Sequence, residues 1–349
     1  MSLDQFGSIE THWKSKLPLV AYRKPNTDKV ISILQNEAKT HYANDFNESG
    51  FVFAPFDKDS PAILIRPDKQ LTIDYRVRKF ELNKTTFEPG HEKGRNYHLE
   101  IVNKGIQEIA HTKLQKVVLS RKIEVPVKSS PIQIFDRVLS CYPNALCYLW
   151  YHPKIGLWIG ATPELLLLRQ NSTINTSSLA GTMKNTSGDK PIWGKKELEE
   201  QVMVTQHITK QLRSFVPDLS VGNVNSAKAG NLWHLKTRIS GTIGDHDLKS
   251  IIDALHPTPA VCGLPVHDAA SFIKSHENYK REYYTGFLGE LNLDKEKTAH
   301  LFVNLRCMQI RDKVASLYVG GGITRDSNPE HEWMETVHKS ETMLNMVFN

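Results

Sequence analysis

The sequence predicts an α+β fold in one domain, because segments with strand and helix patterns occur in clusters and do not alternate regularly. Short runs of strand character occupy the N-terminal third, others follow one another in the middle of the chain, and a further group stands near the C-terminus. No internal repeat, low-complexity segment or Pro- and Ser-rich linker divides the chain. We therefore expect residues 1–349 to form a single domain, with residues 1–90 integrated with a core over 90–345.

The predicted elements of the first third are short strands followed by one helix. Phe51–Pro55 and Ala62–Arg66 are continuous apolar runs, and Leu71–Arg78 alternates partly between apolar and polar residues. The helix is predicted over Asn96–Thr112, because apolar residues recur there at helical spacing.

The rest of the chain contains more strands and two long helices. A helix is predicted over Gly194–Phe215, because apolar residues recur there at helical spacing. Another is predicted over His331–Asn345, which has good helix formers and no internal Gly or Pro. The strands are predicted at Lys116–Ser120, Leu146–His152, Leu157–Ala161, Leu165–Arg169, Ser172–Ser178, Arg238–Ile243, Gly286–Leu293, Ala299–Gln309 and Ala315–Val319.

Composition excludes several classes of protein. No apolar run reaches the roughly 18 residues that a membrane helix needs, and Met1–Lys14 is too polar for a secretory signal, so we expect a cytoplasmic location without membrane contact. The four cysteines lack zinc or disulfide spacing, which predicts reduced core thiols. The net charge is +6, but lysines and arginines are spread along the chain, which favours small anionic substrates over nucleic acid.

The segment from Gly320 to Lys339 carries the clearest chemical pattern. Three consecutive glycines follow an apolar strand, and we expect a flexible turn where another group approaches the backbone closely. On the helix that follows, Glu332, Glu335 and Lys339 lie on one face at i, i+3 and i+7. Two carboxylates one turn apart suit Mg²⁺, and the lysine suits a substrate carboxylate. The alternative is a solvated helix face with ion pairs.

Two further residues are candidates for proton transfer. Lys116 opens an apolar strand, where partial burial of its ammonium would favour release of the proton. Glu164 stands directly before another apolar strand, where burial would raise its pKa and keep it protonated as an acid. The alternatives are an exposed lysine at a strand start and a strand-edge charge that discourages aggregation. Glu200, on the long predicted helix, is a third acidic candidate.

The order of these segments resembles that of the chorismate-utilising enzymes, and most closely the isochorismate synthases among them. The resemblance covers about residues 90–345, and so many ordered motifs rarely coincide by accident. It rests on Lys116–Arg121, Ala161–Leu165, Leu179–Thr182, Glu200, Leu232–Leu235, His256–Gly263, Tyr284–Gly286, Arg306 and Gly320–Lys339. It implies two large, mostly antiparallel sheets packed at the centre of one domain, with helices outside.

The resemblance also implies a role for each candidate residue. Lys116 would activate a water that attacks C2 of chorismate, and Glu164 would protonate the departing C4 hydroxyl, which gives isochorismate reversibly. Mg²⁺ would be held by Glu200, Glu332 and Glu335. The substrate would be bound by Gly181, Thr182, His234, Ala260, Tyr284, Arg306, Gly320 and Lys339, although a tryptophan-flanked histidine such as His234 is as often a packed core residue.

Several positions distinguish this chain from other branches of that family. Anthranilate synthases generally have Gln in place of Lys116, and aminodeoxychorismate synthases have a nucleophilic lysine where this chain has Ala180. Salicylate synthases, which go on to eliminate pyruvate, share Lys116 and Glu164 but tend to have Thr in the segment Pro259–Val261, so they remain the closest alternative. Gln201 departs from the histidine that is common in the family, which puts the affinity for Mg²⁺ in doubt.

The resemblance predicts a protein that acts on chorismate alone. We expect no glutaminase subunit and, since no exposed heptad or swapped segment is visible, a monomer. An inactive chorismate-binding or scaffold protein is the alternative from another class. It is disfavoured because every expected acid, base and metal-binding residue is present. The product would feed menaquinone or siderophore biosynthesis.

Overall fold

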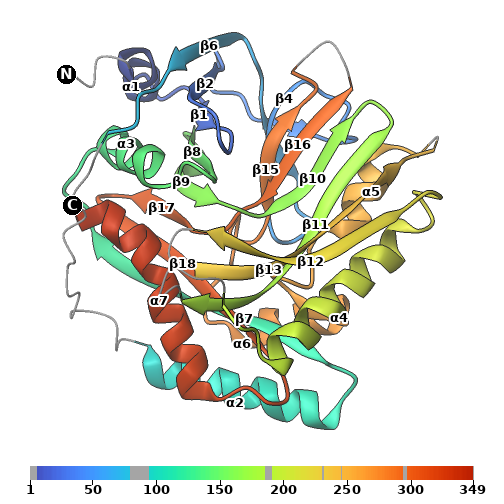
Figure 1. Cartoon of the computed structure of the whole chain (residues 1–349). Coiled ribbons are helices and arrows are strands. Elements are labelled where there is room, and N and C mark those ends of the chain that lie inside the picture. Colours follow the sequence, from blue (N-terminus) through green and yellow to red (C-terminus); the bar gives the residue numbers. More distant parts are fainter. Residues whose placement is uncertain are drawn as a thin grey trace.

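The computed structural model describes residues 6–78, 94–184, 191–229, 232–244, 246–293 and 297–348. Two nine-stranded sheets form its centre, and helices cover their outer faces (Figure 1). Neighbouring strands in the described part of the chain pair in antiparallel fashion. The predicted α+β class is therefore confirmed.

The first sheet joins the N-terminal strands to the strand that begins at Lys116. β1 pairs with β8, so the first strand of the chain lies in the interior of this sheet. In spatial order the strands are β14 (Gly263–Leu264), β7 (Lys116–Pro126), β18 (Val314–Ile323), β17 (Cys307–Arg311), β9 (Gly156–Thr162), β8 (Leu146–His152), β1 (Leu19–Arg23), β2 (Lys29–Leu34) and β6 (Lys69–Asp74).

The second sheet combines the middle of the chain with the other N-terminal strands. Residues of its strands β11 and β13 form one wall of a cavity between the sheets. In spatial order the strands are β12 (Ser220–Ala229), β13 (Leu232–Thr242), β11 (Thr173–Lys184), β10 (Leu165–Gln170), β16 (Thr298–Val303), β15 (Phe287–Leu291), β4 (Gly50–Ala54), β5 (Ala62–Ile65) and β3 (His41–Ala43).

The helices pack on the outer faces of the two sheets. Helix α4 lies on β11 and helix α7 on β18, while α2 lies beside α7 (Figure 1). The helices are α1 (Gly7–Lys14), α2 (Arg95–His111), α3 (Pro131–Cys141), α4 (Lys195–Leu212), α5 (Leu248–Leu255), α6 (Val266–His276) and α7 (Pro329–Phe348).

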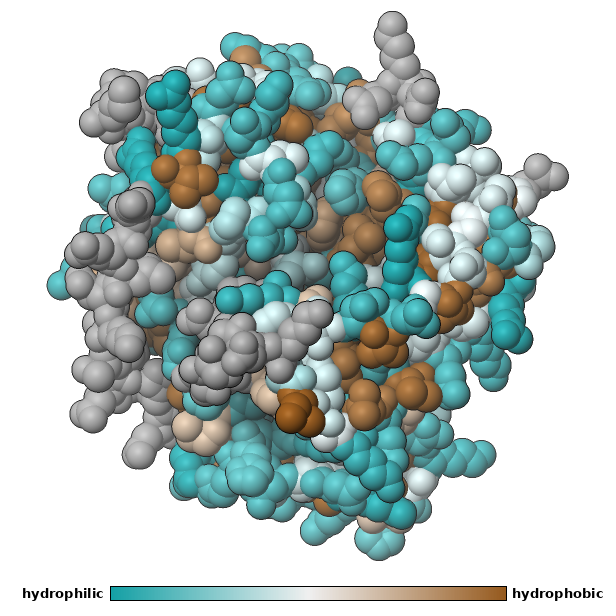
Figure 2. All heavy atoms as spheres, viewed as in Figure 1, coloured by the Kyte–Doolittle hydropathy of each residue, from teal (hydrophilic) through white to brown (hydrophobic). Residues whose placement is uncertain are grey.

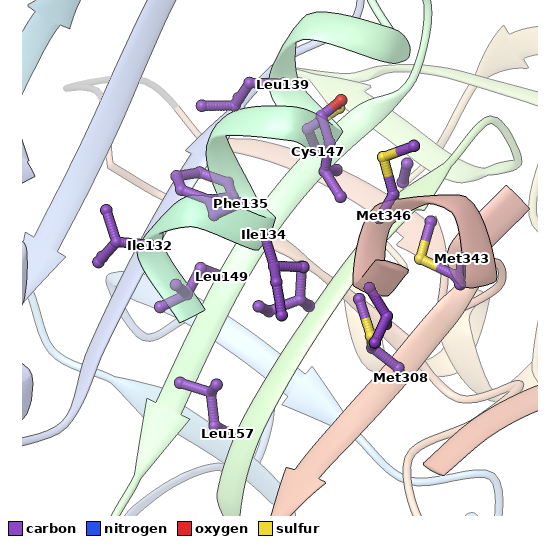
Figure 3. Close-up of a cluster of buried hydrophobic side chains, with 14 of the residues drawn as sticks. Ile132, Ile134, Phe135, Leu139, Cys147, Leu149, Leu157, Met308, Met343 and Met346 are labelled. Carbon is purple, nitrogen blue, oxygen red and sulfur yellow. The ribbon is translucent and has the colours of Figure 1, made fainter. Parts of the chain in front are cut away.

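Apolar side chains hold these layers together. Between the sheets, aromatic rings from both sides meet: the centroid of Phe53 lies 4.6 Å from that of Trp150, and Tyr22 lies 4.9 Å from Phe51. On the outer face of the first sheet, α3 and the C-terminal half of α7 converge on strand residues such as Met308 (Figure 3). The end of α7 is thereby anchored by apolar burial, which is favourable by about 25 cal/mol per Å².

The surface is dominated by polar residues. In Figure 2 hydrophilic residues cover most of the visible face, and apolar residues form small groups between them. Among the described residues, we find no helix that combines the length and the apolar character needed to cross a bilayer.

Several predicted elements have different bounds or neighbours in the structure. Gly320–Gly322 are not a turn but the interior of β18, paired with Ser120, Leu119 and Val118 of β7. The predicted strand Ala299–Gln309 is two strands, β16 and β17, which belong to different sheets and are separated at Asn304–Arg306. An apolar run looks the same whether it continues in one sheet or crosses to another, so its pattern does not reveal such a break.

Candidate active site

The predicted site residues surround one cavity of about 120 Å³ between the two sheets. Strands β7 and β18 contribute to one wall and β11 and β13 to another, and residues of α4 and α7 also line the cavity. Ten predicted residues line it: Glu164, Gly181, Glu200, His234, Ala260, Tyr284, Arg306, Gly320, Glu335 and Lys339. Lys116 and Glu332 are not part of the lining, but Lys116 bonds to the lining residue Glu200 and Glu332 to the lining residue Lys196. The side chain of Thr182 lies outside the described part of the chain.

Lys116 is buried at the start of β7, with 1% of its surface exposed. Its amine donates a hydrogen bond to Oε1 of Glu200 at 2.7 Å, and Glu200 comes from α4 on the other side of the cavity. A methyl group placed on Gly322 would lie 3.0 Å from Cε of Lys116 and 3.1 Å from Oε1 of Glu200. Because Gly322 has no side chain, it leaves room for the contact between Lys116 and Glu200.

Glu164 is a buried carboxyl group on the loop between β9 and β10. Its pKa is raised to about 7 by burial, although Lys116, Lys339 and Arg306 act in the opposite direction. Its exposed fraction is 5%, and it lines the cavity. A carboxyl group with this pKa is protonated in a large fraction of molecules at neutral pH, as a general acid must be.

The three glycines of β18 run directly beneath the charged groups of α7. A methyl group on Gly321 would lie 3.2 Å from Oε2 of Glu332 and 3.6 Å from Oε1 of Glu335. On Gly320 it would lie 2.8 Å from the carbonyl oxygen of Leu119. Close approach, rather than a turn, is therefore the reason for these glycines.

Each predicted metal-binding carboxylate is paired with a lysine in this structure. Glu200 accepts from Lys116, Glu332 accepts from Lys196 at 3.0 Å, and Glu335 accepts from Lys339 at 2.6 Å. The pKa of Glu332 is raised by its burial and by Glu335. Burial also acts to raise the pKa of Glu335, but the neighbouring cations Lys339, Lys196 and Arg306 together outweigh it and the pKa is lowered.

These carboxylates suit a hard divalent cation by their chemistry and position. They are oxygen ligands of the kind that Mg²⁺ prefers, and Glu332 and Glu335 both face the bare backbone of Gly321. Among the described residues no three acidic, histidine or cysteine side chains stand as a ready-made ligand set. A cation would therefore have to displace lysine ammonium groups from the carboxylates it binds.

Cationic and phenolic groups also line the cavity. Lys339 donates to the carbonyl oxygen of Gly320 at 2.9 Å as well as to Glu335. Arg306 stands at the break between β16 and β17, and its Nη1 donates to Thr342 of α7 at 3.0 Å. Tyr284 is buried nearby and stacks on Tyr318 with a centroid distance of 5.3 Å. Donors from three elements thus face one cavity, an arrangement that suits a carboxylate ligand.

His234 lies on β13 at the cavity wall. Its Nδ1 donates to the carbonyl oxygen of Gly181 at 2.9 Å, which fixes the proton on that nitrogen. Burial, with a further contribution from Arg306, lowers the pKa of His234 to about 3, so the ring is neutral. The residue is therefore both packed in the interior and part of the cavity lining.

Gln201 points away from the predicted metal-binding carboxylates. It is fully buried, and its Nε2 donates to Ser178 of β11 at 2.8 Å and to Thr237 of β13 at 2.9 Å. The side chain therefore joins α4 to the second sheet.

Lys196 is a site residue that the sequence analysis did not select. It lines the cavity and binds Glu332, and it is half-buried. The acidic neighbours Glu332, Glu335 and Glu200 outweigh burial and raise its pKa. The signal was present in the sequence, because Lys196 precedes Glu200 by four residues and so shares its face of α4.

The sequence of this chain is similar to those of known proteins. The sequence profile of the chorismate binding enzymes matches residues 62–348. The chain is 31% identical to isochorismate synthase MenF of Escherichia coli over 76% of its own length, and this match spans 64% of MenF. It is 29% identical to isochorismate synthase DhbC of Bacillus subtilis, with 83% of this chain and 78% of DhbC covered.

The fold is shared with a solved relative. The structure of MenF, the menaquinone-specific isochorismate synthase from Escherichia coli, superimposes with a TM-score of 0.78 at 22% identity. The superposition covers 95% of this chain and 88% of MenF. With the profile spanning most of the sequence, the chain belongs to the family of chorismate binding enzymes.

Proposed function

We propose that this protein is an isochorismate synthase, which converts chorismate reversibly to isochorismate. The observation that carries the proposal is the presence, at one cavity, of the buried amine of Lys116 and the buried carboxyl of Glu164 with a pKa of about 7. The reaction needs one group that accepts a proton and another that donates one, in separate environments. Similarity to the isochorismate synthases MenF and DhbC supports the assignment.

In the proposed reaction, one water enters and one leaves. Lys116, as the neutral amine, accepts a proton from the attacking water, whose oxygen forms the bond to C2 of the ring. The ring double bonds shift, and the bond between C4 and its hydroxyl oxygen breaks as Glu164 donates its proton to that oxygen. Arg306 and Lys339 hold the enolpyruvyl carboxylate, Arg306 with parallel hydrogen bonds from its guanidinium. Tyr284 and the backbone at Gly320 complete this clamp.

Mg²⁺ would be held by Glu200, Glu332 and Glu335, and it would supply a positive charge that orients the ring carboxylate of chorismate. The composition of the cavity supports this assignment. Four glutamates but only three lysine or arginine side chains line it, so a substrate with two carboxylates needs further positive charge there. Gly181, Thr182, His234 and Ala260 are proposed to contact the ring.

The remaining features of the proposal concern the protein's setting. We propose that residues 1–349 act as one catalytic domain, as a monomer in the cytoplasm, without a glutaminase subunit. The product would enter menaquinone or siderophore biosynthesis; menaquinone is the route named for the relative MenF. Genes adjacent to the coding sequence would distinguish the two routes.

The activity is tested by incubating the purified protein with chorismate, with and without Mg²⁺, and resolving the products by chromatography and mass spectrometry. An isomer of unchanged mass that forms with Mg²⁺ and reverts to chorismate supports the proposal. Salicylate with stoichiometric pyruvate would identify a salicylate synthase instead. Absence of any conversion, with chorismate still raising the melting temperature, would identify a binding protein.

The pH dependence of turnover should report the protonation of Glu164. Because the acid must carry its proton, kcat is expected to fall on the alkaline side of its pH optimum, as Glu164 loses its proton above its pKa of about 7. The measurement is kcat at saturating chorismate and Mg²⁺ between pH 6 and about pH 9. A constant kcat across this range would contradict the proposed role of the carboxyl.

Substitution of Glu335 by alanine should weaken metal binding. Removing one of three oxygen ligands is expected to raise the Mg²⁺ concentration at half-maximal activity by about tenfold or more. Calorimetric titration with Mg²⁺ alone should show the same change. Glu330→Ala is the matched control, since Glu330 is an exposed residue on the same helix and pairs with Arg95. Equal Mg²⁺ affinity in Glu335→Ala and the wild type would remove Glu335 from the ligand set.

A further inference from the structure

Arg121 is a buried cation that the proposed mechanism does not use. It lies on β7, five residues after Lys116, and its exposed fraction is 8%. The alternation of side chains along a strand places Arg121 on the opposite face from Lys116. There it meets α7: its guanidinium carbon lies 4.0 Å from the ring centroid of Trp333, and its Nε donates to Oγ1 of Thr336 at 2.8 Å.

This arrangement is costly for the stability of the fold. Within the described residues Arg121 forms no ion pair, and its Nη2 is buried without a hydrogen-bond partner. Burial lowers the pKa of Arg121 to about 10. A buried charge contributes little to stability compared with an apolar residue of similar size. The residue is therefore better explained by the geometry that it imposes than by net stabilisation.

The contacts of Arg121 on α7 alternate with the predicted metal-binding carboxylates. Trp333 directly follows Glu332, and Thr336 directly follows Glu335. Because successive residues of a helix are rotated by about 100°, any rotation of α7 that releases Trp333 and Thr336 also moves both carboxylates. Thr336 is itself fixed, since its hydroxyl donates to the carbonyl oxygen of Trp333 at 2.7 Å.

Arg121 contacts the first turns of α7, whereas other groups hold its end. Met343 and Met346 anchor the C-terminal half in the apolar cluster shown in Figure 3. The ring of His98 from α2 also packs near Trp333, at a centroid distance of 5.8 Å. His98 is 1% exposed, and burial followed by the charge of Arg121 lowers its pKa to about 4, so it packs as a neutral ring.

We propose that Arg121 is a positioning residue, which fixes the rotation of the first turns of α7 and thereby the place of Glu332 and Glu335 opposite Lys116. The inference rests on the proposed function, because it assigns these carboxylates to Mg²⁺. Residues that orient metal ligands affect metal affinity without touching the metal.

The test is direct binding of Mg²⁺ to the wild type and to Arg121→Met, measured by calorimetry without chorismate, together with activity as a function of Mg²⁺. Arg121→Met retains much of the apolar volume but lacks the charge, the planar stacking group and the hydrogen bond. We expect its dissociation constant and half-saturating concentration for Mg²⁺ to rise about tenfold, with kcat at saturating Mg²⁺ within a few-fold of the wild type. Arg121→Lys, which retains only the charge, is expected to behave in the same way.

The direction in which Mg²⁺ affinity changes in the Arg121 variants distinguishes a positioning role from a purely electrostatic one. Removing a positive charge near a cation site should by itself strengthen the binding of Mg²⁺. Arg121→Met would then bind Mg²⁺ more tightly, and Arg121→Lys would resemble the wild type. Either result would overturn the proposal.

A matched control removes a contact at the other end of the same helix. Arg137 donates to the carbonyl oxygen of Met346 at 2.8 Å, so Arg137→Met should lower the melting temperature but leave Mg²⁺ affinity unchanged. An equal loss of affinity in Arg137→Met would show a general effect of stability and would overturn the inference. If Arg121→Met does not fold, the Mg²⁺ affinity of Thr336→Val tests the proposal instead. We expect this affinity to be about threefold weaker, because one hydrogen bond to Arg121 is lost.

The wild-type measurement separates the two proposals. Absence of Mg²⁺ binding to the wild type would contradict the metal site of the proposed function. Normal binding and turnover in the wild type, with unchanged affinity in the Arg121 variants, would contradict only the positioning role.

Discussion

Replacement of Lys116 by alanine is expected to lower kcat by about 10³-fold, because general base catalysis commonly contributes between 10² and 10⁴. The variant should still bind chorismate, since the groups proposed to hold its carboxylates, Arg306 and Lys339, are unchanged. Single-turnover assays with product analysis measure the first quantity, and calorimetric titration with chorismate measures the second.

Lys122→Ala is the appropriate control, because Lys122 lies on the same strand but is half-exposed and pairs with Glu124 on the surface. It should retain wild-type activity. Lys116 also forms a buried ion pair with Glu200, so the unfolding temperature of Lys116→Ala must be compared with that of the wild type. A folded variant that kept most of its kcat would show that another group accepts the proton.

Substitution of Glu164 by glutamine is expected to lower kcat by a similar factor of about 10³, because the amide has nearly the same shape but no acidic proton. The residual kcat should also no longer decrease as the pH rises above the Glu164 pKa of about 7, since glutamine does not titrate. Rate measurements across this pH range, on the wild type and the variant in parallel, test both expectations.

The pH profile serves as the internal control of this experiment. If Glu164→Gln were slow but kept the same decrease in kcat above neutral pH, the titrating group of the wild type would be another residue. Full activity in the variant would remove Glu164 from the mechanism altogether.

The sequence was informative where local pattern and burial coincide. The bounds of β8 agree with the predicted strand Leu146–His152, because a run of apolar residues is buried on both faces there. The long helices α2 and α4 were predicted because apolar residues recur in them at helical spacing, and α7 because its segment has good helix formers without internal Gly or Pro. The short helices α3 and α5 were missed, although Ser130 and Asp247 cap them with side-chain hydrogen bonds.

The site could be predicted as a set of residues but not as an arrangement. The order of motifs selected ten residues that line one cavity. The pairing of Lys116 with Glu200 depends on how α4 lies across β7, and nothing in either segment encodes that contact locally. Gly320–Gly322 were wrongly predicted as a turn for the same reason. Consecutive glycines within a strand look like a loop in the sequence as long as the groups that pack against them are unknown.

The pairing of β7 with β18 also constrains when the protein can first become active during folding. Ser120 pairs with Gly320, so this ladder closes a loop of 200 residues, and contacts of such sequence separation are slow to form. Lys116 begins β7 and Gly322 stands near the end of β18, so they meet only when both strands are in register. Recovery of activity after dilution from denaturant should therefore follow, and never precede, protection of the amide hydrogens of this strand pair from exchange.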